Sequence, residues 1–259
     1  MTVHNEHGRL REVVMCEPVH FSLQAINVMA ESFLTKQEHP QAQAITEENR
    51  RLRQAYQAAG IEVHLLEADP KVPYQVFTRD VGVMTSRGML VGGLREDCRR
   101  AEVDTCLASL AMPLWQVSAP QGAYLEGGDL MYLDDRHMAV GVGARTNAAG
   151  AAWACEHLHE QGIDTFIVEF DPRYLHLDMI FNVVGDGFAR AHVEVLPQTF
   201  CRMVYEKLGF DLLPMDDETV FSFGAHRMAL DLHTVLSPAN NTKVNKMLIK
   251  RGFPVVEVS

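Results

Sequence analysis

The chain repeats one arrangement of apolar and polar positions along its whole length. A helix-like run ends and a short apolar, strand-like run follows at five junctions, near residues 60, 112, 162, 209 and 252. Two further strand-like runs precede the helices, for example at residues 81–84 and 89–91, and again at 130–132 and 138–142. The pattern predicts a unit of strand, strand, helix and strand that occurs five times.

Glycine marks four of the five predicted junctions. Gly60, Gly162, Gly209 and Gly252 stand where a left-handed residue commonly ends a helix, and the copy at Met112 lacks one. Repeats of this length are typical of radial and solenoid architectures. We therefore predict an α/β fold of five ββαβ units, in one domain that covers the whole chain. An ordinary α/β domain is the alternative, but all five copies keep the same order.

Composition and charge narrow the classes of partner. A net charge of −11 argues against nucleic acid and anionic membranes, since both repel an acidic surface. No apolar run approaches the ~20 residues of a membrane span, and residues 1–7 do not resemble a signal peptide. The five cysteines contain no CxxC pair, which is typical of reduced thiols in a cytoplasm. We expect a cytoplasmic protein; the sequence leaves a homodimer open.

The histidines do not form a metal-binding pattern. His157 and His159 are two residues apart on a predicted helix at 153–161, so they do not share a face. His226 and His233 flank a strand-like run without an acidic partner at ligand spacing. Because no HExxH, P-loop or GxGxxG stands in the right context, we predict no metal and no organic cofactor.

Three short polar segments occur at nearly equal steps. They lie at residues 77–80, 126–129 and 176–178, and each places a carboxylate or an imidazole at the same point of the repeating unit. If the units surround an axis, these side chains converge on one pocket. Several acids and one histidine suit a planar cation such as a guanidinium, which carboxylates bind through paired N–H···O bonds.

Each segment also has a purely structural interpretation. Asp80 is expected to end a strand at the pocket and accept two substrate N–H groups, but it could form a buried pair with Arg79. Glu126 precedes a glycine pair that lets a ligand approach the backbone, but it could be a turn acid. His176 and Asp178 alternate on a predicted strand and would share a face, but they could form a structural contact.

The segments carry a resemblance to a known superfamily. FTRD at 77–80, EGGD at 126–129, GARTN at 143–147 and HLD at 176–178, in this order, resemble the guanidino-group-modifying enzymes. This superfamily includes arginine deiminases, dimethylarginine dimethylaminohydrolases and amidinotransferases. The resemblance covers essentially the whole chain and implies a five-bladed α/β propeller, the pentein fold, which agrees with the repeat.

The resemblance also implies a covalent mechanism. In the superfamily a cysteine thiolate attacks the guanidinium carbon, and a histidine protonates the departing amine and then activates water. His176 matches this histidine, Glu126 the carboxylate that orients it, and Asp80 the acid that binds the guanidinium. Arg99 and Arg145 match arginines that hold the substrate's carboxylate. Phe77, at the start of the first segment, is expected to line the same pocket.

One departure concerns the nucleophile. In the superfamily it lies in a glycine-rich loop after the last strand of the fifth unit, whereas the sequence given reaches only Ser259, and no cysteine follows Cys201. We expect the loop to lie outside the sequence given; the alternative is a relative that binds arginine without turning it over. Cys16 is expected in the core, and the other four cysteines on or beside helices.

The substrate can be narrowed further. An acid at Asp178, two residues after the histidine, resembles deiminases and amidinotransferases, because a dimethylated nitrogen has no N–H to offer. EGGD resembles the hydrolases more than the transferases. We therefore predict hydrolysis of an arginine-like guanidinium to citrulline, with ammonia or a methylamine as the leaving group. Amidine transfer to an amine is the alternative.

A cover for the pocket is predicted after the first strand. Residues 20–33 form a long connection, and such connections near a site are often mobile. We expect this segment to close over the substrate, with Asn27 contacting the amino-acid end. A helix packed on the rim is the alternative.

Overall fold

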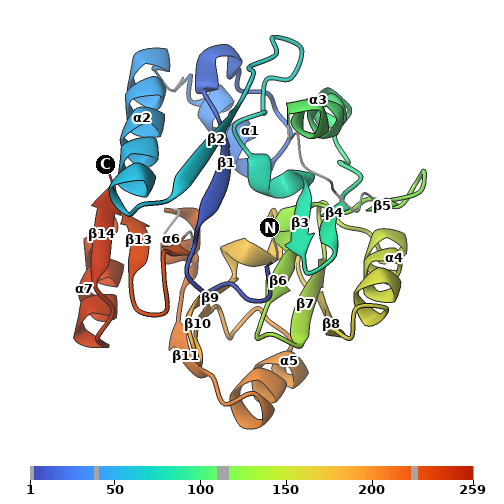
Figure 1. Ribbon diagram of the computed structural model, residues 1–259, viewed down its shortest axis with the longest axis vertical. Coiled ribbons are helices and arrows are strands. Elements are labelled where there is room, and N and C mark those ends of the chain that lie inside the picture. Colours follow the sequence, from blue (N-terminus) through green and yellow to red (C-terminus); the bar gives the residue numbers. More distant parts are fainter. Residues whose placement is uncertain (1–2, 38–40, 110–116, 223–226, 259) are drawn as a thin grey trace.

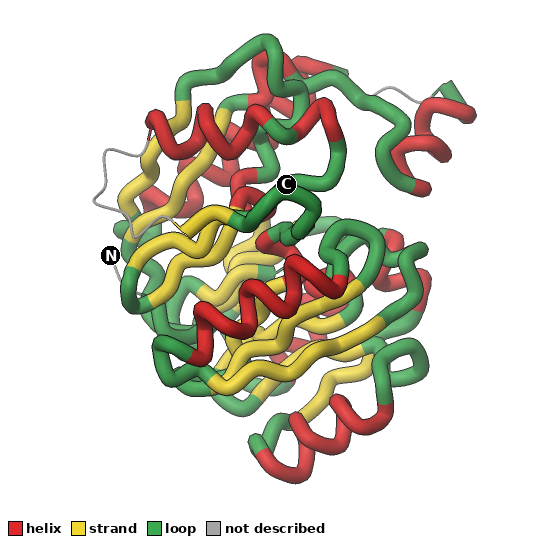
Figure 2. Tube along the Cα trace, turned by 90° about the vertical axis from the view of Figure 1, so that its right-hand side faces the viewer, coloured by secondary structure: helices red, strands yellow, loops and turns green. Residues whose placement is uncertain are grey.

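Five small sheets surround a common centre in the computed structural model, which describes residues 3–37, 41–109, 117–222 and 227–258 (Figure 1). The helices lie on the outer side of the sheets, and the strands lie towards the centre (Figures 1 and 2). This is the predicted α/β propeller of five units, and no closed barrel forms among the described strands.

The five units follow one another along the chain. The first contains β1 (Glu12–Cys16), α2 (Ala42–Ala58) and β2 (Glu62–Leu66). The second contains β3 (Gly82–Thr85), β4 (Gly88–Val91), α3 (Ala101–Ser109) and β5 (Val117–Ser118). The third contains β6 (Leu130–Tyr132), β7 (His137–Val142), α4 (Ala148–His159) and β8 (Asp164–Glu169). The fourth contains β9 (Phe181–Gly185), β10 (Phe188–Ala191), α5 (Gln198–Arg202) with a π-helical extension (Met203–Lys207), and β11 (Asp211–Pro214). The fifth contains β12 (Met228–Ala229), β13 (Val235–Pro238), α7 (Thr242–Lys250) and β14 (Val255–Val258).

Four units have the predicted order in full. In each of them the first two strands are antiparallel, and the strand after the helix pairs in parallel with the second. In the first unit β1 pairs with β2 alone among the described residues, in parallel. Its expected second strand is therefore not formed in the described part of the chain.

Local chemistry fixes the helix ends. Gly60, Gly162, Gly209 and Gly252 all have positive φ, between 74° and 90°, as predicted for left-handed helix stops. The helix of the third unit, α4, begins at Ala148, earlier than predicted, because the Asn147 side chain caps it by accepting a hydrogen bond from the Gly150 N–H at 2.9 Å.

The largest apolar cluster joins the third and fourth units. It includes Met131, Ala139, Leu177, Phe181 and Val183, all buried, and so it packs the start of β9 against β6 and β7. Burying a Phe-sized side chain contributes ~2–3 kcal/mol. This packing fixes the position of the turn that carries His176.

The three polar segments form turns, although a strand end was predicted at Asp80 and a strand at residues 176–178. Thr78–Val81, Gly127–Asp129 and Leu177–Met179 are short 3-10 helices, and each comes shortly before the first strand of its unit. The prediction that Asp80 ends a strand is therefore wrong, and so is the strand alternation of His176 and Asp178. The repeated position itself is confirmed, since each turn occupies the same point of its unit. No helix of the described chain is long and apolar enough to cross a membrane.

Candidate active site

One side chain from each of the three turns meets at the centre. His176 Nε2 lies 2.8 Å from Glu126 Oε2, and His176 Nδ1 lies 3.9 Å from Asp80 Oδ1. All three residues are buried, with Glu126 fully so. The structure thus brings together the predicted catalytic pair and the predicted guanidinium-binding acid.

The histidine and its acid stabilise each other's charged form. Burial alone would lower the pKa of His176, but the charge of Asp80 and the hydrogen bond to Glu126 raise it to about 10. Burial alone would raise the pKa of Glu126, but His176, Arg145 and Arg99 hold it below its usual range. At neutral pH the pair is an imidazolium and a carboxylate, so a proton is available for donation.

The two glycines of the EGGD segment make room for this contact. A Cβ at Gly128 would lie 2.7 Å from Cγ and 2.8 Å from Nδ1 of the His176 imidazole, and one at Gly127 would lie 2.0 Å from the Arg79 carbonyl oxygen. Any larger residue at Gly128 would push the ring away from Glu126. Gly128 is therefore needed for packing of the histidine, and Gly127 for the close approach to the Arg79 backbone.

Arg99 lies behind Asp80 and does not line the cleft. Its Nε and one terminal nitrogen donate to the two carboxylate oxygens of Glu102 at 2.9 and 2.8 Å, and the other terminal nitrogen donates to Asp80 Oδ2 at 2.8 Å. Only 2% of its side chain is exposed. In this arrangement Arg99 is a counter-ion of the acids, and the role expected for it, binding a substrate carboxylate, is not supported by its position.

Glu102 is a member of the cluster that sequence reasoning missed. It is buried, and its pKa is raised by burial, against the opposing effect of Arg99. The signal for it was present: Glu102 follows Arg99 by three residues at the start of a helix, which is a common ion-pair spacing. The sequence could not show that this pair is buried.

Arg145 and Asn27 lie where the predicted cover meets the site. Arg145 donates from one terminal nitrogen to the Ile26 carbonyl at 2.8 Å, and the other lies 3.4 Å from Glu126 Oε1. Asn27 caps α1 (Val28–Thr35) by accepting from the Ala30 N–H at 2.8 Å. Both residues line the cleft. Closure of this segment stays a prediction.

Asp178 and Phe77 complete the set of predicted residues. Asp178 Oδ1 is buried and has no hydrogen-bond partner among the described residues. Phe77 is 44% exposed and stacks on Tyr74 at 5.7 Å between ring centroids. Both line the cleft, so an acceptor oxygen and an aromatic ring face the same space.

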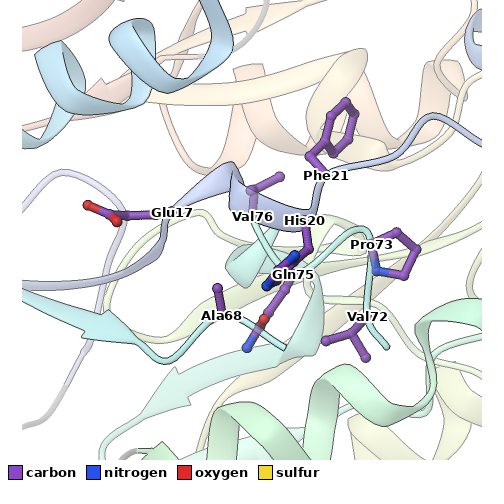
Figure 3. A pocket seen from close by; sticks show the side chains of 8 residues that line it. All are labelled: Glu17, His20, Phe21, Ala68, Val72, Pro73, Gln75 and Val76. Carbon is purple, nitrogen blue, oxygen red and sulfur yellow. The ribbon is translucent and has the colours of Figure 1, made fainter. Parts of the chain in front are cut away.

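The cleft is large enough for an amino acid. Its volume is about 1410 Å³, and its lining is mainly apolar, with Asp80, His176 and Asp178 on its wall. A separate cavity of about 10 Å³ lies between His20, Phe21, Val72 and Gln75 (Figure 3). That cavity has room for about one water molecule, so a substrate site there is excluded.

Comparison with known proteins identifies the family. The family described as "N,N dimethylarginine dimethylhydrolase, eukaryotic" matches residues 17–259. The chain belongs to this family.

Three relatives are similar to most of this chain. The Bacillus subtilis protein YkgA is 26% identical over 98% of this chain and 86% of its own. The Pseudomonas aeruginosa N(G),N(G)-dimethylarginine dimethylaminohydrolase is 25% identical over 84% of this chain and 82% of its own. The Listeria innocua arginine deiminase is 25% identical over 73% of this chain, which covers 57% of that protein.

Solved structures share the fold. Pseudomonas aeruginosa dimethylarginine dimethylaminohydrolase, complexed with citrulline, superposes with a TM-score of 0.80 at 19% identity, over 97% of this chain and 92% of that one. The N-terminal domain of ArgZ, a cyanobacterial arginine dihydrolase, superposes with a TM-score of 0.85 at 18% identity, over 96% of this chain and 90% of that one. Family and fold together support an enzyme of the guanidino-group hydrolase type.

The acid–histidine cluster beside the cleft has the spacing of a possible metal site. Ligand atoms of Asp80, Glu126 and His176 lie within 4.8 Å of one another. A cation there would compete with the proton on His176, whose pKa Asp80 and Glu126 raise, and with Arg99, 2.8 Å from Asp80. The donor set thus suits a proton and a guanidinium better than a metal ion.

No cysteine among the described residues is placed to act as the nucleophile. None of the five is among the residues that line the cleft. Cys16 and Cys106 are buried, as expected for Cys16, and burial raises the pKa of each to about 11. Cys98, Cys155 and Cys201 lie on helical elements, as predicted. A thiolate would have to come from elsewhere.

Proposed function

We propose that the protein hydrolyses the C–N bond of an arginine-like guanidinium and prefers a guanidinium without methyl groups. The carrying observation is Asp178 Oδ1, a buried acceptor in the cleft without a hydrogen-bond partner among the described residues. A buried carboxylate oxygen without a donor costs about 1–3 kcal/mol or more. A guanidinium N–H would supply that donor, whereas a methyl group would not.

Asp80 supplies the second contact. Its Oδ2 is taken by Arg99, which leaves Oδ1, the oxygen nearer to His176, for the substrate. With Asp80 and Asp178 each accepting from the guanidinium, both terminal nitrogens would be held. A planar cation with several N–H donors matches two carboxylates better than a neutral ureido group does.

His176 would act as the acid and then as the base. Glu126 holds Nε2, so Nδ1, which faces Asp80, is the nitrogen directed to the guanidinium position. A thiolate attacks the guanidinium carbon, a C–S bond forms, and the C–N bond breaks as the leaving nitrogen takes the His176 proton and departs as ammonia. Water then attacks the same carbon and gives its proton to His176, and the C–S bond breaks to return the thiolate and release citrulline.

The thiolate is proposed to come from residues that follow β14. Val258, the last described residue of that strand, lines the cleft, so a segment continuing from it would enter the site. Binding of arginine without turnover is the alternative, because none of the five cysteines is among the residues that line the cleft. A cytoplasmic location and a homodimer stay predictions.

The experiment compares three substrates on the full-length natural protein. Arginine, monomethylarginine and asymmetric dimethylarginine are each incubated with it, and citrulline, ammonia and methylamines are measured. Arginine is expected to give the highest kcat/KM, by ~10-fold or more over dimethylarginine, from one unmatched acceptor. The exposed acid Asp171 gives the control variant, Asp171→Asn, which should keep the wild-type order.

Two outcomes would overturn the proposal. A kcat/KM for dimethylarginine equal to or above that for arginine would contradict the preference for a free guanidinium. If calorimetry shows that arginine binds but no substrate yields citrulline, hydrolysis is contradicted and the protein binds arginine without turnover.

A further inference from the structure

A second buried carboxylate lies next to the catalytic pair but outside the cleft. Asp129, the last residue of the EGGD segment, is fully buried and does not line the cleft. Its Oδ1 accepts from the Leu177 N–H at 2.8 Å, and its Oδ2 accepts from the Thr146 hydroxyl at 2.6 Å. One carboxylate therefore links three parts of the chain that are far apart in sequence.

The Thr146 hydroxyl extends this link to Glu126. While it donates to Asp129, the same oxygen accepts from the Glu126 backbone N–H at 3.1 Å. Leu177 is the residue after His176, so the other end of the link holds the backbone beside the histidine. The chain of contacts thus runs from the backbone of Glu126, through Thr146 and Asp129, to the backbone next to His176.

Asp129 lies in surroundings that disfavour its charged form. Burial raises the pKa of Asp129 to about 7, although His176, Thr146 and the Leu177 N–H oppose that shift. A Cβ at Gly141 would lie 2.9 Å from Asp129 Oδ1, so the surroundings are closely packed. An asparagine has only one acceptor oxygen and would turn an NH₂ group towards one of the two donors. The site requires two acceptors.

We propose that Asp129 and Thr146 are positioning residues, which hold the backbones of Glu126 and His176 so that the contact between their side chains stays at hydrogen-bond length. The geometric part of this proposal is independent of the reaction, and its catalytic part rests on the proposed function. A shift of about 1 Å in a catalytic group can cost ~10²-fold in rate.

The test uses a matched pair of substitutions at Thr146. Thr146→Val keeps the shape but removes the hydroxyl, and Thr146→Ser keeps the hydroxyl. The first readout is the downfield ring N–H proton of His176 in the hydrogen bond to Glu126, observed by NMR with ¹⁵N-histidine and assigned with His176→Gln. It should be present in wild type and Thr146→Ser, and lost or broadened in Thr146→Val, while thermal unfolding shows that all three are folded.

Kinetics of the full-length natural protein give the second readout. Thr146→Val should lower kcat by ~10–100-fold with KM changed by less than ~3-fold, because the substrate contacts are untouched and only the catalytic pair moves. Thr146→Ser should stay within ~3-fold of wild type for both. Asp129→Asn should behave like Thr146→Val in both readouts.

The outcomes separate this inference from the proposed function. An unchanged His176 ring proton in Thr146→Val and in Asp129→Asn would overturn it, and so would equal kcat losses in Thr146→Val and Thr146→Ser. Loss of the ring proton in a protein that shows no turnover at all would support the positioning role and count only against the proposed hydrolysis.

Discussion

Two acids near the centre of the molecule, Glu102 and Asp178, differ in what they bind. Glu102 is 1% exposed and holds the guanidinium of Arg99 with both of its oxygens. Asp178 lines the cleft, and its buried Oδ1 has no partner among the described residues. One acid thus holds a guanidinium of the protein with both of its oxygens. The other interacts with the guanidinium of Arg79 only through its charge, and its buried Oδ1 accepts no hydrogen bond from the described residues.

Asp80 combines the two situations, with one oxygen bound to Arg99 and the other free to face a ligand. Its Oδ2 accepts from Arg99, and its Oδ1 lies on the His176 side. The difference teaches that acidic character alone does not define a ligand site, because a buried acid can be fully used inside the protein. The acceptors left over are what indicate a ligand.

The largest effect is expected at His176, where proton transfer takes place. His176→Gln should lower kcat of the full-length natural protein by ~10²–10⁴-fold. Arginine affinity should change far less, since Asp80 and Asp178 remain. Steady-state kinetics and calorimetry on the same preparation measure both quantities. A variant that keeps half of its rate would remove His176 from the general-acid role.

Asp80 should show the next largest effect because it contributes both to arginine binding and to the buried ion pair with Arg99. Removing one partner of a buried ion pair costs ~3–5 kcal/mol. Asp80→Ala should therefore weaken arginine binding by ~10²–10³-fold, and it should also lower the free energy of unfolding, since Arg99 loses a carboxylate. Asp80→Asn should be nearly as harmful for binding. Calorimetry measures the affinity for arginine, and urea unfolding measures the free energy of unfolding. A change in only one of these quantities would mean that Asp80 has only one of the two roles.

Glu102 and Asp178 should separate binding from stability. Asp178→Asn should weaken arginine binding by ~10–100-fold and leave the free energy of unfolding unchanged or higher. Glu102→Gln is the matched variant. It should lower the free energy of unfolding by ~3 kcal/mol or more, because Arg99 loses its two-oxygen partner and keeps Asp80 and the more distant Glu126, at 3.6 Å. It should affect arginine binding less. The opposite pattern, with Glu102→Gln the weaker binder, would reverse the assignment of the two acids.

The sequence allowed much of this site to be predicted, for a physical reason. Asp80, Glu126 and His176 sit at the same point of a repeated unit, and a radial fold brings such points together. The strand predicted at Asp80 and at His176 is a 3-10 turn in both places, because the short apolar neighbours have no periodicity that distinguishes such a turn from a strand end.

Other parts depend on tertiary contacts that a sequence does not display. The link from Thr146 to Asp129 joins residues 17 positions apart through a hydroxyl, and no local pattern marks it. Arg99 matched a substrate-binding arginine by its place in the chain, yet packing turns it towards Glu102. Residues with the right chemistry were found from sequence, but their partners required the fold.

A separate prediction concerns the pH dependence of stability. The pKa of His176 is raised from 6.5 to about 10 by Asp80 and Glu126, against the effect of burial. Its contribution to stability is therefore fully present below pH 6.5 and is lost as the pH rises through about 10. Urea unfolding at pH 6 and pH 10 should show a larger loss for wild type than for His176→Gln. Equal losses would contradict a protonated His176 in the folded protein.

The most direct test of the guanidinium site is calorimetry with arginine and citrulline on wild type and Asp178→Asn. Citrulline has the same amino-acid end, but a neutral ureido group replaces the guanidinium. Wild type should bind arginine far more tightly than citrulline, and Asp178→Asn should narrow that gap by weakening arginine binding. If wild type binds the two ligands equally, or if the gap is the same in both proteins, the acids of the cleft are not a guanidinium site.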